Sequence, residues 1–136
     1  MDLEKSLQVS FAGMSAQGTR LRVIAENLAN ADSAAQTPGG EPYRRKVVTF
    51  KSVLDKSVGA TTVKVARVVS GGGEFERRFD PSHPAADAEG YVLMPNVNPL
   101  LELMDMREAQ RSYEANINVI DAVKSMVSRT IDLLRG

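Results

Sequence analysis

The residues that could do chemistry are few, and they gather in one turn-rich segment. The chain has a single histidine, His83, and no cysteine, so a Ser-His-Asp triad would have to use that imidazole, and thiol nucleophiles are excluded. Asp80, Asp87 and Glu89 could add oxygen ligands for a metal, but they lack the regular spacing and the glycine of a calcium loop. A turn histidine that packs or hydrogen-bonds locally is the simpler interpretation. A small hydrolase centred on His83 is a minor alternative, and we predict no catalytic residue, cofactor or metal.

Two further motifs have ordinary explanations. The triplet Gly71–Gly73 could suggest a phosphate loop, yet no Lys-Ser/Thr pair follows it and no helix is predicted to start there. A flexible turn is expected instead. The basic triplet Arg44–Lys46 and the pair Arg77–Arg78 could contact an acidic partner, or they could form a solvated or protected strand edge.

Length and charge limit the classes of function. With 136 residues, one folding unit is the prior expectation. Seventeen basic and seventeen acidic residues cancel, so no long-range attraction to nucleic acid or to an anionic membrane is predicted. The first ten residues lack the apolar core of a cleavable secretory signal, and no apolar run approaches the ~20 residues of a spanning helix. We expect neither lipid insertion nor export by the general signal-peptide route.

The first helix is predicted from apolar residues at helical spacing. Steps of three, four or seven keep these side chains on one stripe of a helix of about 28 residues. The stripe consists of Leu3, Leu7, Phe11, Met14, Leu21, Ile24 and Leu28. Gly13 and Gly18 lie beside it, and each lowers helix propensity by up to ~1 kcal/mol while allowing another helix to approach closely. The helix should end within Asn27–Ser33, where short polar side chains compete for backbone hydrogen bonds.

The central region predicts short strands. β-branched residues are frequent in Arg44–Leu54 and Thr61–Val69, and Glu74–Phe79 could form a third strand. Prolines bracket Gly90–Val92, which indicates extended or turn segments on either side of it. A small antiparallel sheet or hairpin is expected.

A second long helix is predicted from Asn98, with Asn98 as N-cap, Pro99 at the first helical position and Glu102 in the positive first turn. Its apolar residues then alternate in steps of three and four, with Gln110 and Lys124 as polar interruptions, which is typical of a heptad seam. The seam consists of Leu103, Met106, Tyr113, Ile117, Ile120, Val127, Ile131 and Leu134. About 35 residues would span ~50 Å, more than a small core needs, so part of this face should meet another chain.

These elements predict a mainly α fold with a small β insert. Residues 1–33 form an N-terminal helix, 34–97 a central β-rich region and 98–136 a C-terminal helix, with the terminal helices paired as one coiled-coil domain. Apolar stripes usually mean an ordinary core, but a short β region cannot cover two stripes of this extent. We therefore predict a structural assembly subunit rather than an enzyme. The alternative is a cytoplasmic helical adaptor or an export-chaperone-like binding module, which would capture a partner without polymerising.

Short motifs in order along nearly the whole chain point to a known family. They are Ala16-Gln17, Arg20-Leu21, Asn27-Leu28-Ala29-Asn30-Ala31-Asp32-Ser33, Pro42-Tyr43-Arg44, Gly90-Tyr91-Val92, Met94-Pro95-Asn96-Val97, Arg111-Ser112-Tyr113-Glu114-Ala115-Asn116 and Lys124-Ser125-Met126. On these motifs the sequence resembles the bacterial flagellar basal-body rod proteins of the proximal-rod FlgC type, within the flagellar rod and hook axial family. It departs from the usual pattern at Ser33, where threonine is common, and at Ala85, where aspartate is common.

The resemblance implies a hollow drive shaft that transmits motor torque and conducts exported subunits. Its terminal helices would pair and line the shaft, in the periplasmic part of the basal body, after type III export without a cleavable signal. Implied partners are copies of the chain, other rod proteins, the inner-membrane ring or export-gate adapter, and the export apparatus. The implied assembly interface is Leu7, Phe11, Met14, Leu21, Ile24, Leu28, Leu103, Met106, Tyr113, Ile117, Ile120, Val127, Ile131 and Leu134. The family-motif residues are Asn27, Asn30, Ser33, Tyr91, Pro95, Asn96 and Asn116.

Overall fold

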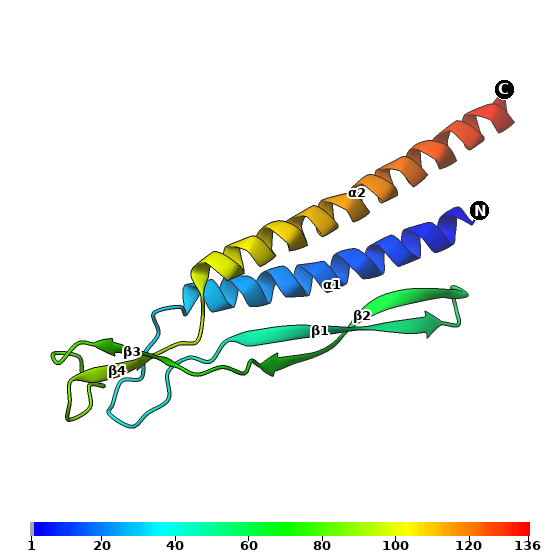
Figure 1. Cartoon of the computed structure of the whole chain (residues 1–136). Helices are drawn as coiled ribbons and strands as arrows, with labels where there is room; N and C mark the ends of the chain where they lie inside the picture. The colour runs from blue at the N-terminus through cyan, green and yellow to red at the C-terminus, as the bar shows by residue number, and fades with distance from the viewer. Residues whose placement is uncertain (1) are drawn as a thin grey trace. The chain divides into compact units, whose positions relative to one another are not determined.

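The computed structural model describes residues 2–136. Along the chain, one long helix precedes the strands and another follows them. The elements are α1 (Leu3–Ala29), β1 (Lys46–Asp55), β2 (Ala60–Ser70), β3 (Glu76–Phe79), β4 (Tyr91–Met94) and α2 (Pro99–Arg135), as drawn in Figure 1. The helices pack together and the strands form small two-stranded sheets between them in the chain. The predicted mainly α fold with a small β insert is confirmed.

The ends of α1 are set by side chains that satisfy free backbone groups. The Asp2 carboxylate accepts hydrogen bonds from the backbone N–H groups of Glu4 (3.0 Å) and Lys5 (3.3 Å), which makes Asp2 the N-cap. At the other end, the Asn30 amide donates to the carbonyl of Glu26 (2.8 Å) and accepts from the Ser33 hydroxyl (3.0 Å). The helix ends inside the polar segment in which the sequence predicted its end.

α2 starts where the local sequence signals place it. The backbone N–H of Leu100 donates to the side-chain oxygen of Asn98 (3.1 Å), and the N–H of Glu102 donates to the Asn98 carbonyl (3.0 Å). Asn98 is therefore the N-cap and Pro99 the first helical residue, as predicted. At 1.5 Å per residue, the 37 residues of α2 span roughly 55 Å.

The contacts of the chain divide it into two compact units. The first contains α1 up to Leu21, Val48–Arg67 and Arg107–Gly136, and the second contains Arg22–Val47 and Val68–Met106. Each helix contributes to both units. The predicted division into terminal helices and a central β-rich region, with boundaries at residues 33 and 97, describes regions of the assembled rod and stays a prediction.

In the first unit, β1 and β2 form a hairpin. The Thr62 hydroxyl donates to the carbonyl of Val53 (3.4 Å) and the Thr49 hydroxyl to the carbonyl of Arg67 (3.3 Å), as antiparallel neighbours require. The turn closes through Gly59, whose N–H donates to the Asp55 carbonyl (2.7 Å) and whose φ of 68° suits glycine.

In the second unit, β3 pairs with β4 rather than with the hairpin. Arg77 lies opposite Leu93 and Phe79 opposite Tyr91 in an antiparallel register. The inward face of β4 packs into a small apolar core made of Ala85, Val92 and Met94, against which Ala34, Ala35 and Ala86 pack. The segment around residue 91, predicted only as extended, thus becomes a strand because Val92 and Met94 need a buried face.

Candidate assembly surfaces

A buried polar junction in the second unit centres on Asn27. Its amide nitrogen donates to the Lys46 carbonyl (2.9 Å) and to the Glu102 carboxylate (3.3 Å). Its amide oxygen accepts from the Tyr43 hydroxyl (2.8 Å) and from the Lys46 N–H (2.9 Å). All four hydrogen-bonding positions of the side chain are used. Asn27, predicted to help end the first helix, instead lies within α1 and ties it to the segment that leads into β1.

Glu102 supplies the negative charge of this junction. Its side chain is 1% exposed, and it pairs with the Arg45 guanidinium, which also lies 3.8 Å from Asp105. The backbone N–H of Arg45 donates to the side-chain oxygen of Asn96 (2.7 Å). A buried carboxylate is tolerated only when it is paired and hydrogen-bonded, so α1, α2 and the start of β1 depend on one another here.

Neighbouring pKa values reflect the same packing. Burial raises the pKa of the Tyr43 hydroxyl above its ordinary value. The Lys46 ammonium, 3.2 Å from the Glu26 carboxylate, lowers the pKa of Glu26 through a hydrogen bond. Arg44 lies 4.4 Å from the centre of the Phe75 ring. The basic triplet therefore has partners within the chain, and Arg45 is a member of the junction that composition alone did not single out.

In the first unit, α1 and α2 meet through small and polar residues. Gly13 is buried, and a Cβ added to it would come within 2.8 Å of the Asn116 amide. One further contact lies seven residues along α1, where Arg20 comes within 3.8 Å of Glu108. The absence of a side chain at Gly13 allows the close approach. Asn116 is held by a hydrogen bond from its amide to the Ser112 carbonyl (3.0 Å).

The predicted interface residues divide into three groups by exposure. Ile24 and Ile120 are buried. The half-buried group is Leu7, Met14, Leu21, Leu28, Met106, Tyr113 and Ile117. The exposed group is Phe11, Leu103, Val127, Ile131 and Leu134. The large apolar side chains are thus only partly used inside the chain.

The residues of α2 that are most buried lie partly one position before those of the predicted seam. Glu102, Ala109, Ile120 and Val123 are buried, and the half-buried residues are Asp105, Met106, Ser112, Tyr113, Asn116 and Ile117. Four of these, Met106, Tyr113, Ile117 and Ile120, belong to the predicted seam, but Glu102 and Ala109 are buried where Leu103 and Gln110 were expected. A search for large apolar residues cannot find this register, because the positions that distinguish it hold small or polar side chains. The small residues noted beside the α1 stripe were the available signal.

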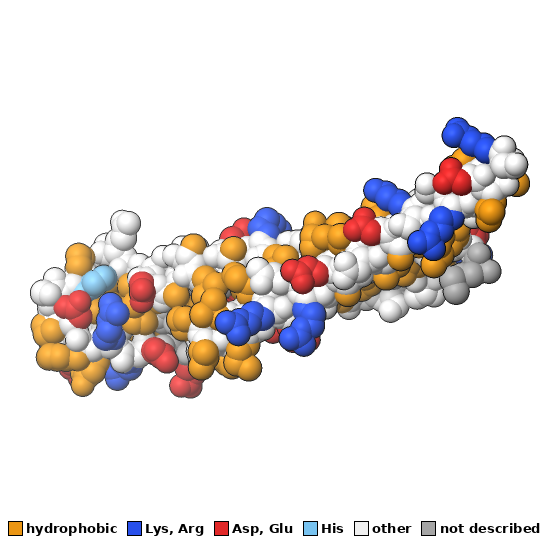
Figure 2. Space-filling model, turned by 90° about the horizontal axis from the view of Figure 1, so that it is seen from above, with side chains coloured by type: hydrophobic (Ala, Val, Ile, Leu, Met, Phe, Trp, Pro, Cys, Tyr) orange, Lys and Arg blue, Asp and Glu red, His pale blue; other side chains and the backbone are white. Residues whose placement is uncertain are grey.

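The last turns of α2 extend past the start of α1. Seven residues along α1, from Gly13 to Arg20, correspond to eight along α2, from Asn116 back to Glu108. Continuing this antiparallel register places Leu3 opposite residues near 126, which leaves 127–135 without a helix beside them. We call residues 127–135 the overhang. Its apolar side chains Val127, Ile131, Leu133 and Leu134 are exposed, the last two at 83%. Figure 2 shows hydrophobic side chains between charged ones at this end.

The remaining motif residues lie around β4. Tyr91 packs edge-to-face on Phe79, with ring centres 5.4 Å apart, and Arg77 lies 4.7 Å from the Tyr91 ring centre. Pro95 is buried, and the Asn96 amide donates to the Gly72 carbonyl (3.3 Å). These residues fix the sheet and the approach to α2.

His83 has a local role in the turn before β4. Its Nδ1 accepts a hydrogen bond from the backbone N–H of Ala85 (3.0 Å). The Asp87 carboxylate accepts the N–H groups of Tyr91 and Glu89, both at 2.9 Å, and the first of these bonds lowers the pKa of Asp87. Within residues 2–136, no group of three or more acidic, histidine or cysteine side chains could hold a metal ion.

Two paired helices with a satisfied polar junction, a partly covered apolar surface and an overhang define a structural assembly protein. Comparison with known proteins gives the family. Residues 88–133 match the model of the flagellar basal body rod FlgEFG protein C-terminal region. The chain belongs to the FlgC family of flagellar basal-body rod proteins, and it is a structural rod subunit rather than an enzyme.

The family membership rests on full-length similarity. The Agrobacterium fabrum rod protein FlgC is 50% identical over 134 residues, which cover 98% of this chain and 96% of the relative. The Salmonella typhimurium FlgC is 43% identical over 135 residues, with 98% of each chain covered. The Bacillus subtilis FlgC is 38% identical over 143 residues, covering 94% and 95%. This similarity favours the rod component over the two alternatives, a helical adaptor and a small hydrolase. Across residues 2–136, neither helix has an apolar stretch that could cross a membrane.

Proposed function

We propose that this chain builds the proximal rod, the hollow drive shaft of the flagellar basal body, through its terminal helices. The overhang carries the proposal, because its nine residues include four exposed apolar side chains and, among residues 2–136, no helix lies beside them. A neighbouring rod subunit would cover them. Burying a leucine that is otherwise exposed contributes roughly 1.5–3 kcal/mol, so a few such contacts suffice for a stable joint.

The specific neighbours follow from the same proposal. Copies of this chain and other rod proteins would contact the exposed stripe residues Phe11 and Leu103 and the overhang. At the base, the inner-membrane ring or the export-gate adapter would take the place of a rod subunit. The chain would reach this position through the type III export apparatus. The small residues at the helix seam and its few large apolar contacts support a subunit that travels unfolded and completes its packing on arrival.

The test compares exposed and buried positions on α2. Leu134→Asp places a charge on a side chain that is 83% exposed in the free chain, so the fold and export should be unchanged while rod assembly and swimming are lost. Ile120→Asp places a charge in the helix pair, where the side chain is buried, and should destabilise the chain itself. Gln110→Asp, at an exposed polar position, is the matched control.

Three measurements separate these outcomes: swimming in soft agar, export into the medium or periplasm, and circular dichroism of the purified chain. Leu134→Asp cells that swim normally would overturn the role of the overhang. Loss of helicity in that variant would instead place Leu134 in the fold of the single chain.

A further inference from the structure

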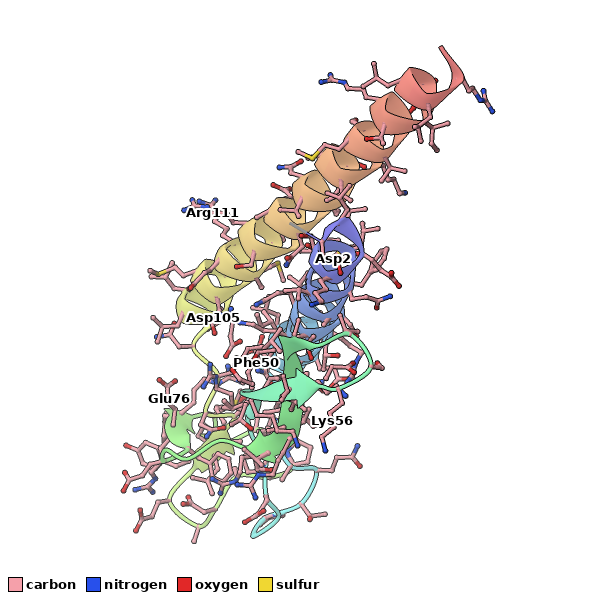
Figure 3. All side chains as sticks on the ribbon, turned by 90° about the vertical axis from the view of Figure 1, so that its right-hand side faces the viewer. Asp2, Phe50, Lys56, Glu76, Asp105 and Arg111 are labelled. Atoms are coloured by element: carbon pink, nitrogen blue, oxygen red, sulfur yellow. The ribbon has the colours of Figure 1, made fainter. Side chains whose placement is uncertain are left out.

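The two small sheets carry opposite charge although the whole chain is neutral. Residues 48–67, which we call the basic hairpin, hold four basic side chains and one acidic one. Residues 74–93, which we call the acidic sheet, hold five acidic side chains and two basic ones. Their net charges are therefore +3 and −3. Figure 3 shows Lys56 at the hairpin turn and Glu76 projecting from β3.

The basic hairpin has an apolar face that is covered only in part, because Val63 and Val65 are half-buried while Phe50 and Leu54 are exposed. Thr62 is the buried residue of β2, so Val63, Val65 and Arg67 lie on the opposite face by the alternation of a strand. On β1, Phe50 and Leu54 share a face and are 37% and 63% exposed. Exposed Phe50 and Leu54, with the exposed basic side chains of Arg67 on β2 and Lys56 in the turn beside this face, resemble the centre and rim of a protein interface rather than a solvated surface.

The acidic sheet offers a matching surface. Phe79, Tyr91 and Leu93 are exposed on one face of it. A hollow of about 320 Å³ opens there, lined among others by Ala85, Tyr91 and Leu93. Its rim carries Asp87, paired with Arg77 at 3.4 Å. The hollow is large enough for a leucine side chain, and the net charge of −3 over residues 74–93 as a whole favours a basic partner.

We propose that the basic hairpin of one copy docks on the acidic sheet of a second copy, with Leu54 directed into the hollow. The inference rests on the proposed function only in that copies meet in the rod. It places a second contact in the β regions, in addition to that of the helices. Because the two surfaces differ, the contact is heterologous, and repeating it gives a ring or an open helical array rather than a closed two-fold dimer. The equal and opposite charges set the direction in which copies add.

The test uses the absence of native cysteine. Lys56→Cys and Glu89→Cys, each in a differently tagged full-length copy, are produced together in cells that assemble rods, and isolated basal bodies are oxidised. Each copy then has a single thiol, so no disulfide can form within one copy, and the two tags identify a disulfide between copies. We expect mixed dimers carrying both tags, and few dimers of Lys56→Cys with itself. In the control, Arg111→Cys takes the place of Lys56→Cys, because the Arg111 side chain lies on α2 and points away from α1 (Figure 3).

Charge reversal provides the second arm. Lys56→Glu with Arg67→Glu should lower the yield of mixed dimers about tenfold at low salt, and adding Glu89→Lys to the same chain should restore part of it. Mixed dimers no more frequent than in the Arg111→Cys control would overturn the proposal. So would a hairpin reversal that abolishes swimming without rescue by the acidic-sheet reversal, because the hairpin would then bind a different acidic macromolecule. Leu134→Asp tests the overhang separately, so either idea can fail alone.

Discussion

Removing the Glu102 carboxylate should cost this small protein a large part of its stability. Glu102→Ala leaves the Asn27 amide with one acceptor fewer and the Arg45 guanidinium without its buried partner. Breaking a buried pair costs about 3–5 kcal/mol. The side chain of Arg45 is 31% exposed and keeps Asp105 at 3.8 Å, so we expect a somewhat smaller loss of stability, about 2–4 kcal/mol.

The matched control lies on the same helix. Glu108→Ala removes the same side chain from an ion pair with Arg20 at 3.8 Å, but Glu108 is largely exposed, so its loss should cost about 0–1 kcal/mol. Glu102→Gln keeps the shape and an acceptor for Asn27 while removing the charge, and should fall between the two.

Urea unfolding of the purified chains, followed by circular dichroism, measures these differences. With a dependence on urea of about 2 kcal/mol per molar, Glu102→Ala should lower the midpoint by about 1–2 M, and Glu108→Ala by much less. Equal midpoints for the two alanine variants would refute the reasoning, because the burial of Glu102 would then have no energetic consequence.

Three further outcomes are expected. Asn27→Asp is nearly isosteric, but it removes two donated hydrogen bonds and places a second carboxylate beside Glu102. It should lower the free energy of unfolding by at least ~3 kcal/mol. An unchanged urea midpoint would contradict the four hydrogen bonds assigned to Asn27. In the free chain, amide hydrogens of residues 127–135 should exchange faster than those in the part of α2 that lies beside α1, and in assembled rods they should become protected. Hydrogen exchange with mass spectrometry measures both. Equal protection in the free chain would mean that the overhang is already covered. Because the pKa of Asp87 is lowered in the folded chain, its carboxylate stabilises the turn between β3 and β4 above about pH 4, and this stabilisation should be lost as the pH falls through the folded-state pKa. The NMR signals of Tyr91 should report this titration in the original chain. If they titrate in the same way in Asp87→Asn, the titrating group is not Asp87.

Local signals along the chain were sufficient for the helices and their ends. Asn98 and Pro99 mark the start of α2 because capping and a fixed φ act within one turn. Asn30 and Ser33 similarly mark the end of α1. Strands were found where β-branched residues cluster, but the pairing of β3 with β4 was not, because pairing depends on which faces become buried.

The sequence by itself determined the two amphipathic helices, the caps, the β-rich centre and, through its motifs, the family. Only the tertiary structure decided the register of the helix pair and the partners of the buried charges. The physical reason is that hydrophobic periodicity records how apolar a face is, whereas close helix contact depends on side-chain volume and on completed hydrogen bonds. Gly13, Asn27 and Glu102 carry little hydrophobic signal, yet they lie where the chain closes on itself, while several larger apolar residues such as Phe11 and Leu134 stay exposed.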